Sequence, residues 1–393
     1  MTKSIEIKKF EDFFDITSSK RVYKSEWTTD GVPFYRTREI VKISKYGSVE
    51  NELYISNEMY NDYKLKYGVP QEGDILVTAV GTLGICYCIK ENDKFYFKDG
   101  NIIWLKKKQE INSRYVEYLF KSESVIKQVN SHIGAVVGTF TIEKAKKTKI
   151  PVPPLTQQQA IVEKLDFAFE AIEKAKANIK KNIQNAKELF QSKLNEIFSQ
   201  KGEGWEIRSL GELGKVSMCK RIMKDQTKDE GDIPFYKIGT FGKKPNAFIS
   251  KEIFHEYSRK YSYPKKGEIL LSASGTIGRC VVFDGAPSFF QDSNIVWITH
   301  DEKLVLNEFL FQFYKICDWN PSKGATISRL YNNDLKKIKI NFPKIEQQKK
   351  LIPRIEKLQE QTDILQEKYK QKLANLEELK KSILEKAFKG ELA

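Results

Sequence analysis

The chain has 393 residues, 40% of them hydrophobic, which is enough for two or three domains that each bury a core. Its 67 Lys and Arg residues against 52 Asp and Glu leave a formal net charge of +15, which favours a polyanionic partner, nucleic acid first and an anionic membrane surface second. The longest weakly polar run, residues 75–89, is too short to span a bilayer. The segment MTKSIEIKKFEDFF at the start lacks the succession of basic, apolar and small residues that a secretory signal has. We therefore expect a cytoplasmic protein without a membrane partner.

The chain repeats itself along its whole length. IEIKKFEDFFDITSSKRVYK from residue 5 matches WEIRSLGELGKVSMCKRIMK from residue 205, an offset of 205 − 5 = 200. VPFYR at 32–36 then matches IPFYK at 233–237, and GDILVTAVGTLGIC from residue 73 matches GEILLSASGTIGRC from residue 267. KKTKIPVPPLTQQQ at 146–159 matches KKIKINFPKIEQQK at 336–349, where the offset is 336 − 146 = 190. We expect two related units, with insertions inside their globular parts.

Each unit is predicted to begin with a strand-rich part. Runs such as DILVTAV, NIIWL, EILLSAS and NIVWI end at Gly, Asp or Pro, a pattern typical of short strands with turns. The glycines of the repeated GTLG and GTIG loops have two interpretations: a turn that needs glycine, or a close approach of backbone N–H groups to an anion. Cys86 and Cys88 have no second pair at zinc-finger spacing, so we interpret them as small apolar residues on one side of a strand.

A long helix is predicted to follow each strand-rich part. Residues 157–198 contain no Gly or Pro, and residues 345–393 repeat their apolar pattern, so both are expected to form coiled-coil helices that pack antiparallel on each other. Pro353 stands where the first tail has Glu163, and we expect it in the first turns of the second helix, where its cost is smallest if that helix starts late. SQKGEGW at 199–205 is the expected hinge between the halves. The expected seam of the first helix comprises Leu165, Ile172, Ile179 and Ala186, with Ala168, Ala175 and Leu189 in its second row.

Motifs for catalysis are missing from the sequence. Neither GTLG nor GTFGKK has the spacing of a nucleotide-hydrolase loop, and the GxG at 202–204 lies in the hinge rather than after a strand. In DWNPSK, Ser322 and Lys323 replace the second proline and the aromatic of an amino-methyltransferase motif. His132, His255 and His300 have no partners at metal-binding spacing. We therefore expect no catalytic site, no metal and no cofactor on this chain.

Residue types that contact DNA gather near the repeated motifs. Arg and Lys neutralise phosphates or pair with guanine, and Ser and Thr contact phosphates or base edges. The predicted DNA-binding residues are Arg36, Arg38, Lys42 and Thr82 in the first half and Lys237, Lys243, Lys244, Ser274, Thr276 and Arg279 in the second.

The order of these segments resembles a known family. PVPPLTQQQAIVEKL at 151–165 and FPKIEQQKKLI at 342–352 each join a strand-rich part to a long helix, GWEIRSLGEL at 204–213 opens the second half, and LEKAFKGEL at 384–392 ends it. This arrangement resembles the specificity subunit of type I restriction-modification systems over essentially all of the chain. The proline–glutamine junction and the ending are more specific motifs than the glycine loops.

The resemblance implies a mixed α/β (α+β) chain with two target-recognition domains in a pseudo-two-fold repeat, separated by two long antiparallel coiled-coil helices. The expected boundaries are 1–154 for the first target-recognition domain, 155–204 for the central helix and hinge, 205–344 for the second domain and 345–393 for the distal helix. Each domain would read one half of a bipartite double-stranded DNA target with a non-specific spacer.

The resemblance also implies partners. Two modification (methyltransferase) subunits would bind the long helices, and restriction subunits would join them. AdoMet, ATP and Mg²⁺ would then be bound by partner subunits, and this chain would be a non-catalytic specificity subunit. We expect part of the apolar rim of the helices to remain uncovered and to bind partner helices, at Phe169, Phe190, Phe198, Leu376 and Leu379.

Two other classes of function stay open. A stand-alone DNA-binding or DNA-modifying enzyme fused to a recognition module would need an acidic metal cluster, and none stands out in the sequence. A coiled-coil scaffold would explain the helices, but neither the two basic strand-rich parts nor the excess of positive charge.

Overall fold

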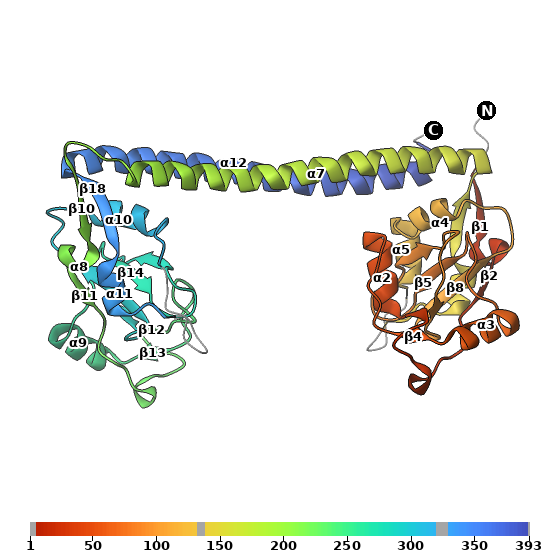
Figure 1. Ribbon diagram of the computed structural model, residues 1–393, viewed down its shortest axis with the longest axis horizontal. Coiled ribbons are helices and arrows are strands. Elements are labelled where there is room, and N and C mark those ends of the chain that lie inside the picture. The colour runs from red at the N-terminus through yellow and green to blue at the C-terminus, as the bar shows by residue number, and fades with distance from the viewer. Residues whose placement is uncertain (1–4, 132–137, 320–328, 392–393) are drawn as a thin grey trace. The chain divides into compact units, whose positions relative to one another are not determined.

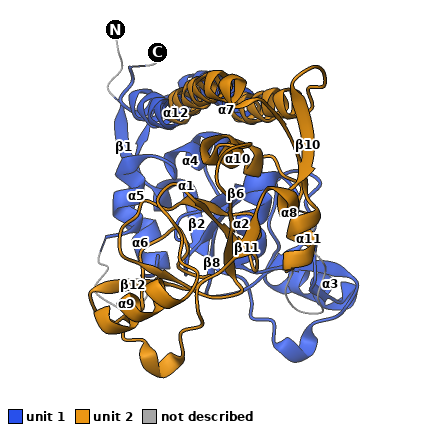
Figure 2. Ribbon diagram, turned by 90° about the vertical axis from the view of Figure 1, so that its left-hand side faces the viewer, with its two compact units in different colours: residues 1–179, 371–393 blue, residues 180–370 orange. Residues whose placement is uncertain are grey.

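The computed structural model describes residues 5–131, 138–319 and 329–391 (Figure 1). It divides into two compact units, one formed by residues 1–179 and 371–393 and the other by residues 180–370 (Figure 2). His132, Ser322 and Lys323 lie outside the described residues. Each unit contains one globular part and a stretch of both long helices, α7 (Leu155–Phe198) and α12 (Ile345–Phe388).

The globular part of the first unit has three small sheets. The largest sheet is antiparallel and comprises, in spatial order, β2 (Phe14–Thr17), β8 (Ile102–Lys107), β5 (Ile75–Thr78) and β6 (Cys86–Cys88). The others comprise β4 (Tyr54–Ile55), β3 (Val32–Tyr35) and β7 (Tyr96–Phe97), and the pair β1 (Glu6–Lys9) and β9 (Lys149–Val152). The helices are α1 (Phe10–Phe13), α2 (Thr37–Tyr46), α3 (Asn57–Lys66), α4 (Ser113–Leu119), α5 (Glu123–Val129) and α6 (Ile142–Lys147), with a 3₁₀ turn, η1 (Lys24–Glu26).

The second unit repeats this plan. Its largest sheet comprises β11 (Lys215–Ser217), β17 (Ile295–Thr299), β14 (Ile269–Ser272) and β15 (Cys280–Val282). The others comprise β13 (Phe248–Ile249), β12 (Ile233–Tyr236) and β16 (Phe289–Phe290), and the pair β10 (Trp205–Ser209) and β18 (Lys339–Pro343). The helices are α8 (Leu210–Leu213), α9 (Lys251–Lys260), α10 (Asn307–Tyr314) and α11 (Asn332–Lys337), with the 3₁₀ turn η2 (Lys224–Gln226). The predicted strand runs are confirmed as β5, β8, β14 and β17.

The largest sheet of each unit lies between two apolar cores. Successive side chains of a strand point to opposite faces, so Ile75 and Val77 of β5 enter one core with Leu105, and Leu76 enters the other with Trp104. The first three positions of the strand are therefore all apolar instead of alternating. β14 divides its side chains between two cores in the same way.

The units differ most in the segment after β3 and β12. The helix α2 follows β3, whereas residues 237–247 form turns after β12. The repeat offset falls here from 233 − 32 = 201 to 267 − 73 = 194, so the second half is shorter in this stretch. The α2 segment is therefore one of the insertions predicted inside the globular parts.

A buried glutamine near the start of each long helix attaches it to the globular part. Gln158 is 2% exposed; its Nε2 donates to the Pro153 carbonyl at 2.8 Å and its Oε1 accepts from the Asn112 backbone N–H at 2.9 Å. Gln348 repeats this arrangement in α12 and accepts from the Leu306 N–H at 2.9 Å. The matching TQQQ and EQQK segments therefore have the same structural role.

The two long helices run antiparallel within each unit. In the first, Glu173 of α7 pairs with Lys380 of α12 at 2.8 Å, and Lys176, one turn further on, pairs with Glu377, one turn earlier. The core of the second unit likewise contains residues of both helices. α12 begins at Ile345 and continues through Pro353, its ninth residue, so the proline lies beyond the first turns and the helix does not start late.

Three aromatic side chains predicted to form an uncovered rim are buried by the chain's own globular parts. Phe169 packs edge-on against Tyr118 of α4, with ring centroids 5.5 Å apart. Phe198 packs on Phe309 of α10 at 4.8 Å, and Phe190 belongs to the same core. The expectation was wrong because the globular parts cover these ends of the helices.

Other apolar positions of the long helices are exposed. Leu376, which was also predicted to bind partner helices, is partly buried against the core of the first unit. Leu189, predicted in the second row of the seam, is 59% exposed, so the heptad pattern extends further than the buried contact. The exposed apolar side chains of the two helices, called here the uncovered helix face of each unit, are Leu155, Phe167 and Leu379 in the first unit and Leu189, Ile364 and Leu365 in the second.

Candidate nucleic-acid interface

The repeated glycine loop joins two neighbouring strands of the largest sheet in each unit. The Thr78 hydroxyl at the end of β5 donates to the Thr82 carbonyl and accepts a backbone N–H from the far side of the loop at 3.0 Å. Ser272 at the end of β14 donates to the Thr276 carbonyl and accepts from the Arg279 N–H at 2.9 Å. A hydroxyl thus closes each loop from inside, while Thr82 and Thr276 at the tips are exposed.

The loop glycines are required by backbone geometry. Gly81, Gly84, Gly275 and Gly278 have φ values of +82°, +75°, +66° and +84°, which side chains rarely adopt. A Cβ at Gly278 would also lie 2.2 Å from Nε1 of Trp319. The N–H groups of Gly84 and Gly278 bond to the last residue of the preceding strand, so they are not free to bind an anion. These observations favour the structural turn.

The predicted arginines of the first unit are engaged in ion pairs at the start of α2. Arg36 and Arg38 both bond to Glu39, which is 3% exposed, and Arg38 also pairs with Glu52. Burial raises the pKa of Glu39, but the hydrogen bonds from the two arginines outweigh burial, and the net shift is downward. Lys42, one turn further along, is exposed. The arginines therefore help to hold the α2 segment in place.

In the second unit the predicted residues gather around two adjacent loops. Arg279 donates from Nη1 to the Phe241 carbonyl at 2.9 Å, which joins the glycine loop to the turns at 237–247. Ser274 is buried and its hydroxyl donates to Asn294 at 2.7 Å, so its hydrogen-bonding capacity is largely used inside the unit. The exposed cations beside this junction are Lys237, Lys243 and Lys244.

A repeated group of basic and aromatic residues was missed by sequence reasoning. Arg21 donates from Nε to Asp99 at 2.8 Å, and Arg221 donates from Nε to Asp292 at 2.9 Å. Each arginine side chain is mostly exposed, at 63% and 67%, while each carboxylate is largely covered. The ammonium of a neighbouring lysine lies over a tyrosine ring, 5.3 Å from its centroid in one unit and 4.8 Å in the other. This basic cluster comprises Lys20, Arg21 and Tyr67 in the first unit and Lys220, Arg221 and Tyr261 in the second.

The basic clusters lie beside the loops that contain η1 and η2, which project from the globular parts away from the long helices (Figure 1). Hydrogen bonding to Asp99 raises the pKa of Arg21, so the guanidinium remains charged. Binding through Nε orients the guanidinium and leaves its outer nitrogens to face solvent, a geometry suited to a phosphate. The signal available in the sequence was the repeated Lys-Arg pair together with the aspartates of FKDGN and FQDSN.

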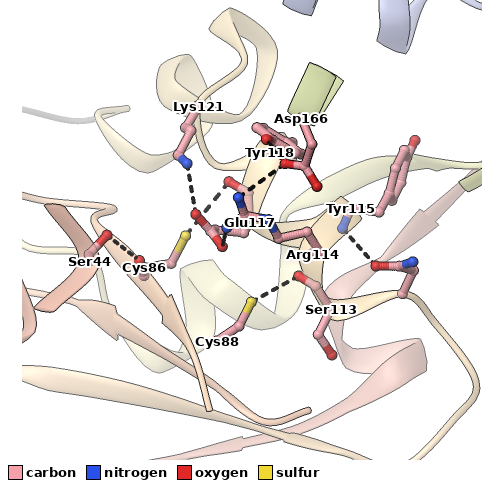
Figure 3. Close-up of polar contacts among 11 residues, drawn as sticks. Ser44, Cys86, Cys88, Ser113, Arg114, Tyr115, Glu117, Tyr118, Lys121 and Asp166 are labelled. Atoms are coloured by element: carbon pink, nitrogen blue, oxygen red, sulfur yellow. Dashed lines mark hydrogen bonds and ion pairs between the residues drawn. The ribbon is translucent and has the colours of Figure 1, made fainter. Parts of the chain in front are cut away.

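The cysteines of β6 face the helix α4. The Cys86 thiol donates to the Glu117 carbonyl at 3.7 Å and the Cys88 thiol to the Ser113 carbonyl at 3.1 Å (Figure 3). The prediction that both lie on one side of a strand is confirmed. Burial raises the pKa of both thiols, which keeps them protonated. Within residues 5–131, 138–319 and 329–391, no three His, Cys, Asp or Glu side chains are grouped to hold a metal, and no helix there has the length and apolarity needed to cross a membrane.

A duplicated mixed α/β unit combined with two long helices defines a fold found in solved type I restriction-modification proteins. One chain from a study of complex assembly and conformational transition in a type I system aligns with a TM-score of 0.76 at 20% identity, covering 98% of each chain. The HsdS subunit from Thermoanaerobacter tengcongensis aligns with a TM-score of 0.62 at 18% identity, covering 100% of this chain and 98% of that one. At these identities the likeness concerns the fold.

Sequence comparison identifies the family. The model of the type I restriction modification DNA specificity domain matches residues 2–185 and 202–375, and the chain belongs to this family. A protein named as a type I restriction enzyme specificity subunit in Haemophilus influenzae is 41% identical over 306 residues, 76% of this chain and 78% of that protein. The EcoBI specificity subunit of Escherichia coli is 23% identical over 421 residues, 96% of this chain and 84% of that protein.

Proposed function

We propose that this chain reads a bipartite double-stranded DNA target, with one half-site for each unit and a non-specific spacer between them, as the specificity subunit of a type I restriction-modification complex. The observation that carries the proposal is the basic cluster, which occurs at matching positions in two units of the same fold. A net charge of +15 favours the same class of partner.

Residues that the two units share and segments in which the units differ suit different kinds of DNA contact. Phosphates are the same in every DNA sequence, so contacts present in both units, those of Arg21 and Arg221, suit the backbone. Base edges differ between half-sites, so they suit the segments in which the units differ, α2 and residues 237–247. Lys237, Lys243 and the exposed parts of Arg279 are the candidate base contacts of the second unit.

Exchanging the second recognition domain tests the assignment of one half-site to each unit. Residues 205–344 are replaced by the equivalent segment of a relative, the complex is assembled with its modification subunits, and the methylated DNA sequences are mapped. One half-site is expected to change and the other to stay the same. A change in both half-sites would mean that the units read DNA jointly, contrary to the proposal.

Removing one arginine of each basic cluster tests the phosphate assignment. Arg21→Gln and Arg221→Gln are each expected to weaken binding equally to all DNA sequences and to lower the slope of log K against log salt by about one. Arg208→Gln is the matched control, because Arg208 is a partly exposed arginine on β10 that pairs with Glu206. An altered sequence preference, or an effect equal to that of the control, would refute the assignment.

The chemistry is proposed to reside in partner subunits. Two modification subunits would bind the uncovered helix face, and AdoMet, ATP and Mg²⁺ would be bound by modification and restriction subunits. Phe167 is 77% exposed on α7, and Phe167→Asp is expected to reduce co-purification of the modification subunit without changing the thermal stability of the chain. Leu65→Asp on α3, where Leu65 is 88% exposed, is the control. Equal co-purification of both variants would exclude this face.

A further inference from the structure

The second unit contains an open cavity between α10 and α12. Its volume is about 730 Å³, within the range of sites that bind ligands or peptide segments. Apolar side chains of α10 and α12, including Phe311 and Ile364, form part of its lining. The other lining groups are mostly acidic, in a protein whose net charge is strongly positive.

The carboxylates of this cavity outnumber the cations near them: Lys315 interacts with Asp363 and Glu356, and otherwise Glu302 and Asp363 accept only neutral hydrogen bonds, from the Asn307 N–H and from Gln359. Glu302, Glu308, Glu356, Glu360 and Asp363 line it, and none of them forms an ion pair with another described residue. The lining includes one cation, Lys315, whose ammonium lies over the Phe311 ring, 4.8 Å from the centroid. Negative charge therefore predominates.

Two buried amide oxygens at the cavity lack hydrogen bonds. Asn307 is 8% exposed and Gln312 is 3% exposed, and both line the cavity. Asn307 Oδ1 and Gln312 Oε1 are buried without a donor among the described residues. Unpaired buried acceptors are unfavourable, and they are satisfied if the two amide groups turn toward a ligand that donates hydrogen bonds.

At the equivalent place in the first unit, an arginine of the chain itself pairs with the carboxylates, beside a smaller cavity of about 410 Å³. Arg114 donates from Nη2 to Asp166 of α7 at 3.1 Å and from Nη1 to Glu117 at 2.6 Å (Figure 3). The Tyr118 hydroxyl donates to the same Asp166, and Lys121 bonds to Glu117 at 2.7 Å. The carboxylates of this site are therefore paired internally.

The duplication identifies what the second unit lacks. The second residue of α4 is Arg114 and that of α10 is Glu308; the sixth residues are Tyr118 and Gln312. The twelfth residue of α7, Asp166, corresponds to the twelfth of α12, Glu356, so the carboxylate that accepts the guanidinium is kept. The fifth residues are Glu117 and Phe311, so the second unit has kept one of the two acceptors, lost the other and lost the arginine.

We propose that the cavity of the second unit binds an arginine side chain, flanked by apolar residues, that belongs to a partner protein. Its guanidinium pairs with Glu356, as that of Arg114 pairs with Asp166, and its remaining N–H groups satisfy the amide oxygens of α10. Apolar neighbours of the arginine contact Phe311 and Ile364. Anionic lipids and nucleic acids are repelled by the same carboxylates. The inference does not depend on DNA recognition.

Peptide selection tests this proposal with no DNA present. Random peptides displayed on phage are selected for binding to the full chain. Peptides that also bind the Glu308→Arg/Gln312→Tyr/Gln359→Phe variant are then removed. This variant carries the residues that the first unit has at the same helix positions, Arg114, Tyr118 and Phe169. We expect the surviving peptides to be enriched in arginine next to apolar residues. Survivors without arginine, or none beyond background, would overturn the proposal.

A single substitution locates the binding of a selected peptide. Glu356→Gln is expected to weaken binding, measured by fluorescence anisotropy, about tenfold or more, because a hydrogen-bonded charge pair is lost. Glu367→Gln is the matched control, since Glu367 is an exposed carboxylate on the same helix that pairs with Lys370. Replacing the arginine of the peptide by citrulline should have an effect similar to Glu356→Gln. Equal affinities for the two protein variants would show that the cavity is not the site.

Discussion

Gln348→Leu is expected to lower the unfolding free energy of the second unit by about 2–6 kcal/mol. The side chain is fully buried, and leucine has a similar volume, so the loss reflects hydrogen bonding rather than a cavity. Oε1 accepts from the Leu306 N–H at 2.9 Å, and Nε2 donates to the Pro343 carbonyl at 2.8 Å and to that of Leu304 at 2.7 Å.

The magnitude follows from the groups left without a partner. Leu304 is exposed, so we count only the Leu306 N–H and the Pro343 carbonyl, at about 1–3 kcal/mol each when buried and unpaired. This is a large part of the roughly 5–15 kcal/mol that stabilises a domain. Gln158→Leu should produce a similar loss in the first unit, because its hydrogen bonds match those of Gln348.

Urea unfolding followed by tryptophan fluorescence measures the effect, since Trp297 is buried in the core of the second unit. Gln347→Leu, at the exposed neighbouring position, is the control and should stay within about 0.5 kcal/mol of the unmodified chain. If Gln348→Leu and Gln347→Leu unfold at the same urea concentration, the buried glutamine does not attach α12 to the globular part.

Three further changes test separate features. Gly275→Ala should lower the unfolding free energy by about 1 kcal/mol, because the glycine has a positive φ. Gly278→Ala should lower it by about 2 kcal/mol or more, because the added Cβ would also collide with Trp319. Equal shifts of the two variants in thermal unfolding would contradict this. Burial raises the pKa of Glu268, so its folded form binds protons more tightly than its unfolded form, and stability falls as pH rises through the raised pKa. Glu268→Gln should therefore be more stable than the unmodified chain at pH 8 and lose this advantage near pH 4, as measured by urea unfolding. Pro353→Ala, inside α12, should raise the unfolding free energy by up to about 3 kcal/mol, and an unchanged urea midpoint would show that the helix already accommodates proline.

The duplicated plan was predictable because each of its signals is local. A short apolar run bounded by turn residues and a long stretch without Gly or Pro can be read from neighbouring residues, and the repeat supplied two independent copies of each. The strands β5 and β14 and the starts of α7 and α12 follow from such patterns.

The candidate interface was less predictable because it depends on residues far apart in the chain. Arg21 is held by Asp99, and Arg221 by Asp292, and nothing next to the arginines indicates these partners. Conversely, Arg36 looked available for DNA, yet it bonds to Glu39, whose burial depends on the whole unit.

The sequence by itself determined that this protein has two units of one fold, each beginning with short strands and ending in a long helix, because backbone preference and apolar spacing act over a few residues. Only the tertiary structure decided which apolar side chains are covered: Phe169 and Phe198 are buried by α4 and α10, while Phe167 is exposed. The same long-range packing decided that Arg114 pairs with Asp166 in the first unit, while the carboxylates of the equivalent site beside Glu308 lack an arginine of the chain. Burial and charge pairing depend on which distant segments meet, and local patterns do not carry that information.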